Sequence, residues 1–396
     1  MKKPRIAFVI SHPIQHFCPM YASLAEDDSW EFKVFFASTA GLEGYFDPNF
    51  NQKISWKGID INSFSHHFLN GDEPLPISAA LDAPSVAEEL DAYQPDVVVL
   101  YGYSQKVQRR AYFWAKRNNK KIFYTSDSEV HGPRPLWKDA LKYIPLRWYF
   151  SHVDACLSVG NANENYYYQY GVPTSKLFRH GYPIDARFYD KAYEKHDEKR
   201  AAIREEYNIP ADEFVCAMVG KLVPWKAQHT IIDALKVLED KGVYGVTGMM
   251  MGSGVDMESL QEKAKILKHN RVILTGFVEA ITLCDYYAAA DVYVHTSNHE
   301  PHSVAISEAI YMGKPLIISD HCGSYGSMDD LQLGKNGFVY PFGKADQLAL
   351  RIQQFLQQPE LVKEFGDYSH KYAYENQQRA HGGGLRAALR AYDFQV

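Results

Sequence analysis

Residues 290–309 (ADVYVHTSNHEPHSVAISEA) place two carboxylates at and beyond a predicted helix start, directly after an apolar strand. Pro301 suits the first position of a helix, so the backbone N–H groups of about residues 303–305 are expected to lack helical partners. Such groups and the helix dipole bind anions such as a diphosphate. Glu300 and Glu308 would be separated by roughly 12 Å of helical rise, comparable to a nucleoside diphosphate, so they suit the hydroxyls of a sugar and of a ribose. The alternative is a helix N-terminal acid and a solvated glutamate.

Two lysines and several glycines follow other predicted strands. Lys221 and Lys226 come after the strand at 213–219 and would neutralise phosphates, unless they are simply solvated. Gly252-Ser-Gly254 and Gly276-Phe-Val278 also follow strands, where backbone groups can meet a phosphate or a base edge. Tight turns at these glycines are the alternative explanation.

A polar loop follows the first predicted strand. His12, Gln15 and His16 would bind an acceptor or a phosphate there. The alternative is that one or two of them cap the following helix.

The elements that position these loops alternate between strands and helices. The predicted strands are 5–10, 31–36, 96–101, 121–125, 154–159, 213–219, 245–251, 271–275, 291–296 and 315–319. Segments with helical spacing fit between them, so the sequence predicts doubly wound parallel sheets in two α/β domains. Ligands of such sheets bind outside the carboxyl ends of the strands.

Composition excludes several classes of protein. The chain has 396 residues with 42 basic and 48 acidic side chains, a net charge of −6 that argues against general nucleic-acid binding. The five cysteines include no CxxC pair, which favours a reducing, cytoplasmic compartment and gives no zinc spacing. No apolar run approaches the roughly 18 residues of a membrane-spanning helix.

One segment is strongly basic. Residues 106–150 contain eleven basic and three acidic residues, interleaved with aromatic ones. This pattern fits contact with anionic lipid headgroups, which would make the protein peripheral at the inner face of the membrane. The alternative is a helix with an apolar core face and a solvated basic face.

The motifs also occur in a recognisable order, which is GKLVPWK at 220–226, GSG at 252–254, GFV at 276–278, ADV at 290–292, EPHSVAISEA at 300–309, GKPLII at 313–318 and NGF at 336–338. With HGYPIDARF at 180–188 they resemble the donor-binding half of a retaining glycosyltransferase of family 4, over residues 180–366. The resemblance implies the GT-B fold, in which two Rossmann-like domains face each other across a cleft. We expect an acceptor-side domain at 1–185, a donor-binding domain at 186–370 and a last helix at 371–396 that packs back on the first domain.

The resemblance also implies roles for individual residues. Lys221 and Lys226 would clamp the donor diphosphate, Glu308 would bind the ribose and Glu300 the donor sugar, with the base along residues 276–278. The expected donor-binding residues are Gly220, Lys221, Lys226, Gly252, Gly254, Gly276, Phe277, Val278, Glu300, His302, Ser303, Val304, Ala305 and Glu308. The expected catalytic residues are Glu300, Lys226, Lys221 and either Asp127 or His131.

The chain departs from the family pattern in places. Lys221 stands where arginine is more common, and His302-Ser303 where Phe-Gly is common. The loop at residues 11–17 lacks the family's glycines. The family often has a histidine after a middle N-terminal strand, and here either Asp127 would replace it or His131, four residues later, would reach in from the loop. The alternative for either residue is a structural cap.

We therefore expect a cytoplasmic retaining glycosyltransferase that moves a sugar from a nucleoside-diphosphate donor, with UDP favoured and GDP next, to a hydroxyl acceptor. No metal or other cofactor is expected, since lysines and a helix N-terminus would stabilise the departing diphosphate. Two alternatives are open. One is a sugar-nucleotide epimerase of the same fold, and the other is a non-catalytic scaffold that binds a nucleotide sugar.

Overall fold

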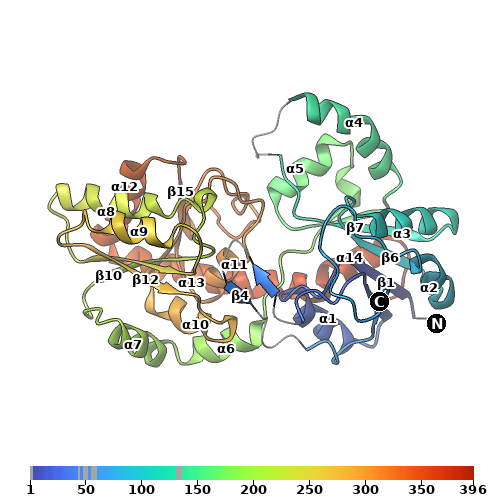
Figure 1. Cartoon of the computed structure of the whole chain (residues 1–396), viewed down its shortest axis with the longest axis horizontal. Coiled ribbons are helices and arrows are strands. Elements are labelled where there is room, and N and C mark those ends of the chain that lie inside the picture. Colours follow the sequence, from blue (N-terminus) through green and yellow to red (C-terminus); the bar gives the residue numbers. More distant parts are fainter. Residues whose placement is uncertain (1–2, 43–44, 48–51, 55–59, 131–135) are drawn as a thin grey trace. The chain divides into compact units, whose positions relative to one another are not determined.

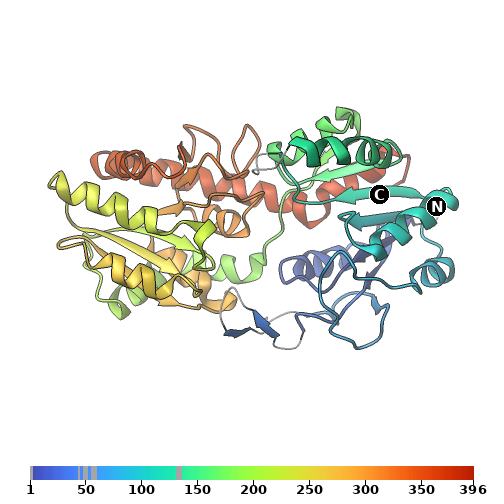
Figure 2. The same ribbon diagram turned by 45° about the horizontal axis from the view of Figure 1, so that its top comes forward.

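The computed structural model describes residues 3–42, 45–47, 52–54, 60–130 and 136–396, which fold into two compact units (Figure 1). The first unit comprises Met1–Tyr45, Ile54–Ile184 and Asn376–Val396, and the second comprises Phe46–Lys53 and Asp185–Glu375. Each unit is built on its own parallel β-sheet with helices on both faces, as Figures 1 and 2 show. The predicted fold class of two Rossmann-like domains is therefore confirmed.

The sheet of the first unit has seven strands in the order β5-β2-β1-β6-β7-β8-β9, all paired in parallel. Its strands are β1 (Arg5–Ile10), β2 (Glu31–Phe36), β5 (His66–Phe68), β6 (Val97–Tyr101), β7 (Lys121–Thr125), β8 (Ala155–Ser158) and β9 (Leu177–Arg179). Its helices are α1 (Phe17–Ala25), α2 (Val86–Tyr93), α3 (Lys106–Arg117), α4 (Leu136–Ser151), α5 (Asn161–Gln169) and α14 (Gly384–Ala391), with a short 3₁₀ turn η1 (Thr174–Lys176) before β9.

Both faces of this sheet are apolar because a helix layer covers each of them. In β1, Ala7 and Val9 join the core beneath α2–α5, whereas Ile6, Phe8 and Ile10 join the core beneath α1 and α14. Alternate side chains of a strand point to opposite faces, so a strand covered on both sides reads as a continuous apolar run. This explains why the first strand is so clear in the sequence.

The sheet of the second unit has six parallel strands in the order β12-β11-β10-β13-β14-β15. They are β10 (Phe214–Val219), β11 (Val246–Met251), β12 (Arg271–Gly276), β13 (Val292–His295), β14 (Leu316–Ser319) and β15 (Gly337–Tyr340). Its helices are α6 (Ala186–Glu194), α7 (His196–Glu206), α8 (His229–Asp240), α9 (Met257–Ala264), α10 (Ala280–Ala289), α11 (Val304–Tyr311), α12 (Ala345–Gln357) and α13 (Pro359–Gln378), with a 3₁₀ turn η2 (Pro224–Lys226). A π-helical segment η3 (Arg379–Gly383) follows α13, and the chain rejoins the first unit at Asn376.

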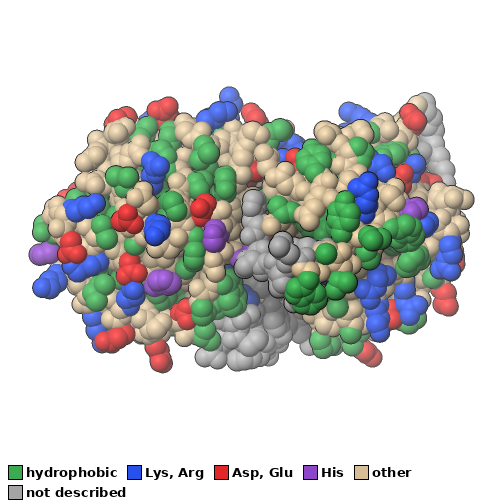
Figure 3. All heavy atoms as spheres, turned by 90° about the horizontal axis from the view of Figure 1, so that it is seen from above, with side chains coloured by type: hydrophobic (Ala, Val, Ile, Leu, Met, Phe, Trp, Pro, Cys, Tyr) green, Lys and Arg blue, Asp and Glu red, His purple; other side chains and the backbone are tan. Residues whose placement is uncertain are grey.

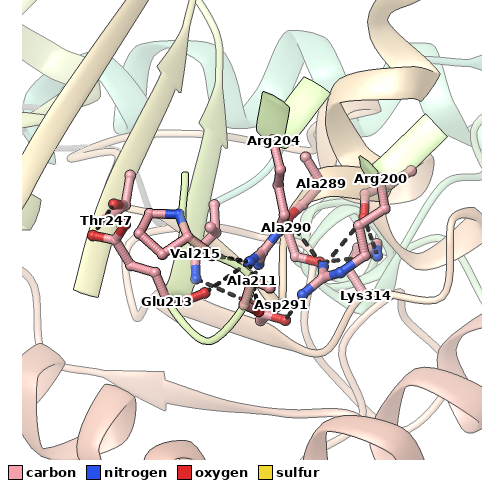
Figure 4. A network of polar contacts seen from close by, with 12 residues as sticks. Arg200, Arg204, Ala211, Glu213, Val215, Thr247, Ala289, Ala290, Asp291 and Lys314 are labelled. Carbon is pink, nitrogen blue, oxygen red and sulfur yellow. Dashed lines mark hydrogen bonds and ion pairs between the residues drawn. The ribbon is translucent and has the colours of Figure 1, made fainter. Parts of the chain in front are cut away.

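A buried ionic network fixes the amino ends of the central strands in the second unit (Figure 4). Asp291, just before β13, accepts hydrogen bonds from Arg200 at 2.7 Å, from Arg204 at 2.8 Å and from the Val215 N–H of β10 at 2.7 Å. Lys314 donates to the Ala290 carbonyl at 3.0 Å, and burial lowers its pKa to about 7. The cations lie at the C-terminal end of α10, where the helix dipole favours positive charge. The network therefore sets where β10 and β13 begin, and so where their carboxyl ends emerge.

All ten predicted strands are present with ends within one residue of the prediction. Within the described ranges, five short strands were not predicted from the sequence. Three of them, β5, β9 and β15, lie at sheet edges, and the other two, β3 (Tyr45–Asp47) and β4 (Gln52–Ile54), pair in a two-stranded sheet. Runs of three or four residues carry too few positions for a periodic pattern to stand out. Throughout the part of the chain that is described, every helix is too short or too polar to cross a lipid bilayer.

Candidate functional site

The polar residues singled out in the second half of the sequence gather where the strand order of the second sheet reverses. From β10 the chain passes through α8 to β11 on one side, and later returns through α10 to β13 on the other side. The loops that follow β10 and β13 therefore diverge from adjacent strands. Such a reversal point is where open α/β sheets bind ligands. The loop after β10 holds Lys221 and Lys226, and the loop after β13 holds Glu300.

Lys226 and Glu300 form a mostly buried ion pair across this reversal point. The Lys226 ammonium contacts Glu300 Oε2, and the two side chains are only 15% and 16% exposed. Two hydrogen bonds hold the two loops together. The Thr296 hydroxyl donates to the backbone carbonyl of Lys226 at 2.6 Å, and the Asn298 N–H donates to the backbone carbonyl of Trp225 at 2.7 Å. Burial raises the pKa of Glu300, but the charge of Lys226 and the hydrogen bond of His295 outweigh it and lower the pKa to about 2. Glu300 is therefore ionised at neutral pH.

His295 is part of this cluster although no sequence motif singled it out. Its Nε2 lies 3.2 Å from Glu300 Oε2 and 3.0 Å from the Ser297 hydroxyl, and its Nδ1 lies 3.2 Å from the Tyr293 hydroxyl. Burial lowers the pKa of His295, which favours a neutral ring. A neutral ring with its proton on Nε2 donates to Glu300 and accepts from Tyr293. The sequence signal that could have identified His295 is its position at the end of a strand, five residues before Glu300.

The helix after Glu300 does not begin at Pro301. α11 starts at Val304 with Ser303 as its N-cap residue, and Pro301 lies in a bend before the helix. The prediction that Pro301 occupies the first helical position is therefore wrong, and the expected helical rise from Glu300 to Glu308 does not apply. The Ser303 N–H is occupied, since it donates to the Ser324 hydroxyl at 3.1 Å. The N–H groups of Val304 and Ala305 remain the first-turn donors of α11, which by helix geometry have no acceptor within the helix.

His302 is buried behind the start of α11. Its Nε2 lies 3.3 Å from Asp330 Oδ2 and 3.4 Å from the Ser307 hydroxyl, and its Nδ1 lies 3.4 Å from the Ser324 hydroxyl. Ser307 also donates to Asp330 at 2.6 Å. These contacts tie the start of α11 to the segment that contains Ser324 and Asp330. His302 therefore has a positioning role in the structure, and the sequence did not anticipate Asp330 as its partner.

Glu308 is half-buried rather than solvated. The Tyr287 hydroxyl of α10 lies 3.0 Å from Glu308 Oε2, and Tyr189 of α6 also hydrogen-bonds the carboxyl group. Burial raises the pKa of Glu308 to about 7, while the two tyrosines act in the opposite direction. The alternative of a solvated glutamate at this position is wrong. The two tyrosines were not selected from the sequence, because nothing in their spacing connects them to Glu308.

The glycines after β10 and β11 allow two loops to touch. A Cβ atom at Gly252 would lie 1.9 Å from the Gly220 carbonyl oxygen, and one at Gly254 would lie 2.2 Å from the Leu222 carbonyl oxygen. The contact is held by hydrogen bonds from the Gly220 N–H to the Met251 carbonyl and from the Leu222 N–H to the Ser253 carbonyl. Close backbone approach thus explains Gly252 and Gly254, in line with the structural alternative for these glycines. The close approach also places the loop that follows β11 beside the loop that carries Lys221 and Lys226.

Gly276 ends β12 with a φ of +77°, and its carbonyl accepts from the Gly252 N–H at 2.9 Å. Phe277 and Val278 follow it and are half-buried. The four loops that follow β10, β11, β12 and β13 therefore lie along one edge of the sheet.

In the first unit, the loop after β1 carries the predicted histidines. His12 lies 2.8 Å from the Ser11 hydroxyl, and burial lowers its pKa to about 4. His16 occupies the N-cap position of α1 but makes no capping hydrogen bond through its side chain, and its ring packs 4.8 Å from that of Tyr182. Gln15 is half-buried in the same loop. The capping explanation therefore does not account for the His16 side chain.

Asp127 follows β7 and is half-buried, and its charge raises the pKa of Tyr101 and Tyr167 in addition to burial. His131 lies outside the described residues, so the choice between Asp127 and His131 stays open. Among the residues that are described, no three His, Cys, Asp or Glu side chains are placed together to hold a metal ion.

Residues 199–372, which contain this site, match the family described as glycosyl transferases group 1. EpsD of Bacillus subtilis, whose name marks it as a candidate glycosyltransferase, is 25% identical over 294 residues, which cover 72% of this chain and 73% of EpsD. The lipopolysaccharide core biosynthesis glycosyltransferase LpsE of Rhizobium meliloti is 29% identical over 172 residues, which cover 43% of this chain. The match spans only about half of LpsE, 48% of its length.

The fold is also shared with a solved structure. HepE of Anabaena, in complex with UDP and glucose, superposes with a TM-score of 0.69 at 18% identity, over 98% of this chain and 100% of that chain. At this identity the likeness concerns the two-domain fold alone. Residues 199–372 are thus related in sequence to group 1 glycosyl transferases, and the candidate site lies within the related part.

Proposed function

We propose that this protein is a retaining glycosyltransferase that moves a sugar from a nucleoside-diphosphate donor to a hydroxyl acceptor. UDP is the favoured nucleotide and GDP the next, and the acceptor is a glycan, a lipid-linked glycan or a small molecule in cell-surface polysaccharide or glycoconjugate synthesis. The protein would act in the cytoplasm. The observation that carries the proposal is the Lys226–Glu300 pair at the reversal point of the second sheet, next to the first turn of α11.

The diphosphate would be held by positive charge and backbone donors. Lys221 and Lys226 follow β10, and the first-turn N–H groups of Val304 and Ala305 open α11. As the sugar–phosphate bond breaks, negative charge grows on the diphosphate, and donors already in place stabilise it without a metal ion. Lys226 can serve the phosphate while it stays near Glu300, because an ammonium group has three donors.

The two glutamates would hold the sugar and the ribose. The contacts of Lys226, His295 and Ser297 all go to Glu300 Oε2, so a sugar hydroxyl is expected to donate to Oε1. Glu308 would bind the ribose hydroxyls, with Tyr189 and Tyr287 fixing its orientation. Residues 276–278 would lie along the base. Retention would follow from attack on the same face that the diphosphate leaves, with no covalent intermediate on the protein.

Support for UDP comes from the shared fold with HepE, which was solved with UDP and glucose. Support for a surface glycan comes from LpsE, which is named for lipopolysaccharide core biosynthesis. His12, Gln15, His16 and either Asp127 or His131 would serve the acceptor side.

Thermal unfolding with UDP, GDP, ADP, CMP and dTDP, each with and without magnesium, tests the donor site. A ligand at 100 times its Kd adds about 2.7 kcal/mol to stability, which raises Tm measurably. We expect one diphosphate, UDP first, to raise Tm without magnesium, and Glu308→Ala to remove the effect. Glu360→Gln, on the exposed start of α13, is the matched control and should keep it. The absence of any shift would overturn the donor site.

Turnover of the stabilising nucleotide's sugars with an acceptor panel tests the reaction. We expect transfer with retained anomeric configuration, and a loss of about 100-fold or more in Glu300→Gln while nucleotide binding persists. Conversion of the donor to an isomer without acceptor would instead identify an epimerase. Binding without any turnover across the panel would favour the scaffold.

A further inference from the structure

Helix α4 exposes an apolar stripe that its own unit does not bury. The side chains share one face because their positions are spaced by four, three and four residues. They are Trp137, Leu141, Ile144 and Trp148, exposed by 61%, 70%, 76% and 46%. The opposite face of the helix is in the core through Leu146, Tyr149 and Phe150. Helix α4 therefore has the apolar core face that the alternative expected, and it has an exposed apolar stripe in addition.

Helix α3 presents a basic stripe with one aromatic residue in it. Its exposed face carries Lys106, Arg109, Arg110, Phe113 and Arg117. These five residues line one side of a groove of about 520 Å³ whose other side is formed by Asp82, Pro84 and Ala87.

The groove keeps a net positive charge. Asp82 is the acid that lines it, and this carboxylate is matched by Arg110 through two hydrogen bonds of 2.6 and 2.9 Å. Lys106, Arg109 and Arg117 then remain in excess over the acidic charge of the groove. An anion that enters the groove would meet at least two cations and the Phe113 ring.

The two stripes form one continuous surface. The rings of Phe113 and Trp148 lie 6.3 Å apart, and the Lys116 ammonium lies 4.2 Å over the Trp148 ring. Beneath them, Tyr112 and Tyr149 stack at 4.1 Å and fix α3 against α4. Figure 3 shows hydrophobic side chains next to lysine and arginine side chains on the part of the molecule formed by the first unit. We call the surface formed by the apolar stripe of α4 and the basic stripe of α3 the α3–α4 surface.

We propose that the α3–α4 surface docks on an anionic lipid bilayer, with the α4 stripe in the interface and a lipid phosphate in the groove. Tryptophan near both ends of an apolar stripe suits the headgroup level, and flanking cations suit anionic lipids. A second copy of the chain fits less well, because two basic grooves would repel each other. This docking is independent of the proposed transfer reaction, although a lipid-linked acceptor would be reached at such a surface.

Flotation with vesicles tests the proposal on the full chain. Phosphatidylcholine vesicles are compared with vesicles that also contain phosphatidylglycerol, at low and at high salt. We expect binding to the anionic vesicles alone, with a loss of about tenfold or more at roughly 1 M salt, where charges are screened beyond about 3 Å. Ile144→Glu and the pair Arg109→Glu with Arg117→Glu should each lower the bound fraction by about tenfold. Leu350→Glu, at a leucine of α12 in the second unit that is 47% exposed, is the matched control and should bind as the wild type does.

Three outcomes would overturn the proposal. The first is equal binding of the wild type and Ile144→Glu to anionic vesicles. The second is a wild-type dimer, seen by sedimentation, that Ile144→Glu converts to a monomer without any vesicle binding. The third is binding of inorganic phosphate that Arg109→Glu removes, in a protein that ignores vesicles. A UDP-induced rise in Tm that is the same in all variants shows that the variants are folded, and keeps this test separate from that of the donor site.

Discussion

Lys226 and Glu300, from loops that follow adjacent strands, meet as an ion pair in which both side chains are mostly buried. The pair joins the turn η2 to the segment before α11, and the buried His295 contacts the same carboxylate oxygen. Two charges in such a place stabilise each other mainly by preventing the cost of an unpaired buried charge. The contribution of the pair to stability can therefore be measured separately from its contribution to function.

Removing one partner of this pair should cost more than removing both. We expect Lys226→Met to destabilise the protein by about 3 kcal/mol, since it leaves the Glu300 carboxylate buried without its cation. The double variant Lys226→Met with Glu300→Gln should recover much of this loss. Urea unfolding of the wild type, both single variants and the double variant gives the coupling energy. Additive effects would contradict a direct interaction.

Glu308 should make the protein less stable as the pH rises. Its pKa of about 7 in the folded chain exceeds the ordinary value of 4.5, so the folded chain holds this proton more tightly than the unfolded chain. Stability from this group is then complete below pH 4.5 and is lost as the pH rises to about 7. We expect Glu308→Gln to be the more stable protein at about pH 8, by at most about 3 kcal/mol, and to match the wild type near about pH 4.

The check on this prediction is the pH dependence rather than the stability at one pH. Glu258→Gln, at an exposed glutamate of α9, is the control and should show no such difference between acidic and mildly alkaline pH. A Glu308→Gln difference that is constant with pH would show that Glu308 keeps an ordinary pKa.

The framework of the site could be predicted from the sequence better than its inner contacts. Apolar runs located β10 and β13, and therefore the loops of Lys226 and Glu300, because buried parallel strands are continuous in sequence. The partners of the site residues come from distant elements, such as Tyr189 of α6 and Asp330 beyond β14, and spacing along one element carries no information about them. Pro301 was wrongly placed at the first helical position of α11 because proline fits both a first helical turn and the bend that it occupies.

Lys221 should matter for the phosphates of the donor but not for its nucleoside. A charged hydrogen bond to phosphate contributes about 1.5–3 kcal/mol, so Lys221→Ala should weaken UDP binding by about 10- to 100-fold. The Kd of uridine, which has no phosphate, should change by less than about twofold in the same variant. Titration calorimetry with UDP and uridine measures both, and Lys241→Ala, at an exposed lysine after α8, is the control. Equal weakening of UDP and uridine would place Lys221 away from the phosphates.

Gly252 should be the least replaceable glycine of the site, because its neighbours leave no room for a side chain. An alanine Cβ there would lie 1.9 Å from the Gly220 carbonyl oxygen, a clash that only a backbone shift can relieve. We expect Gly252→Ala to cost more than about 3 kcal/mol in urea unfolding and to weaken UDP binding, since the loop of Lys221 must shift.

Gly242, in the turn before β11, is the matched control for this substitution. Its φ is +74°, and an added Cβ would meet no atom of the described residues within 4 Å, so alanine there meets only the left-handed backbone cost of about 1–2 kcal/mol. Gly242→Ala should therefore lose some stability but bind UDP normally. Similar losses of stability and equal UDP binding for the two variants would show that the loops after β10 and β11 do not need their close approach.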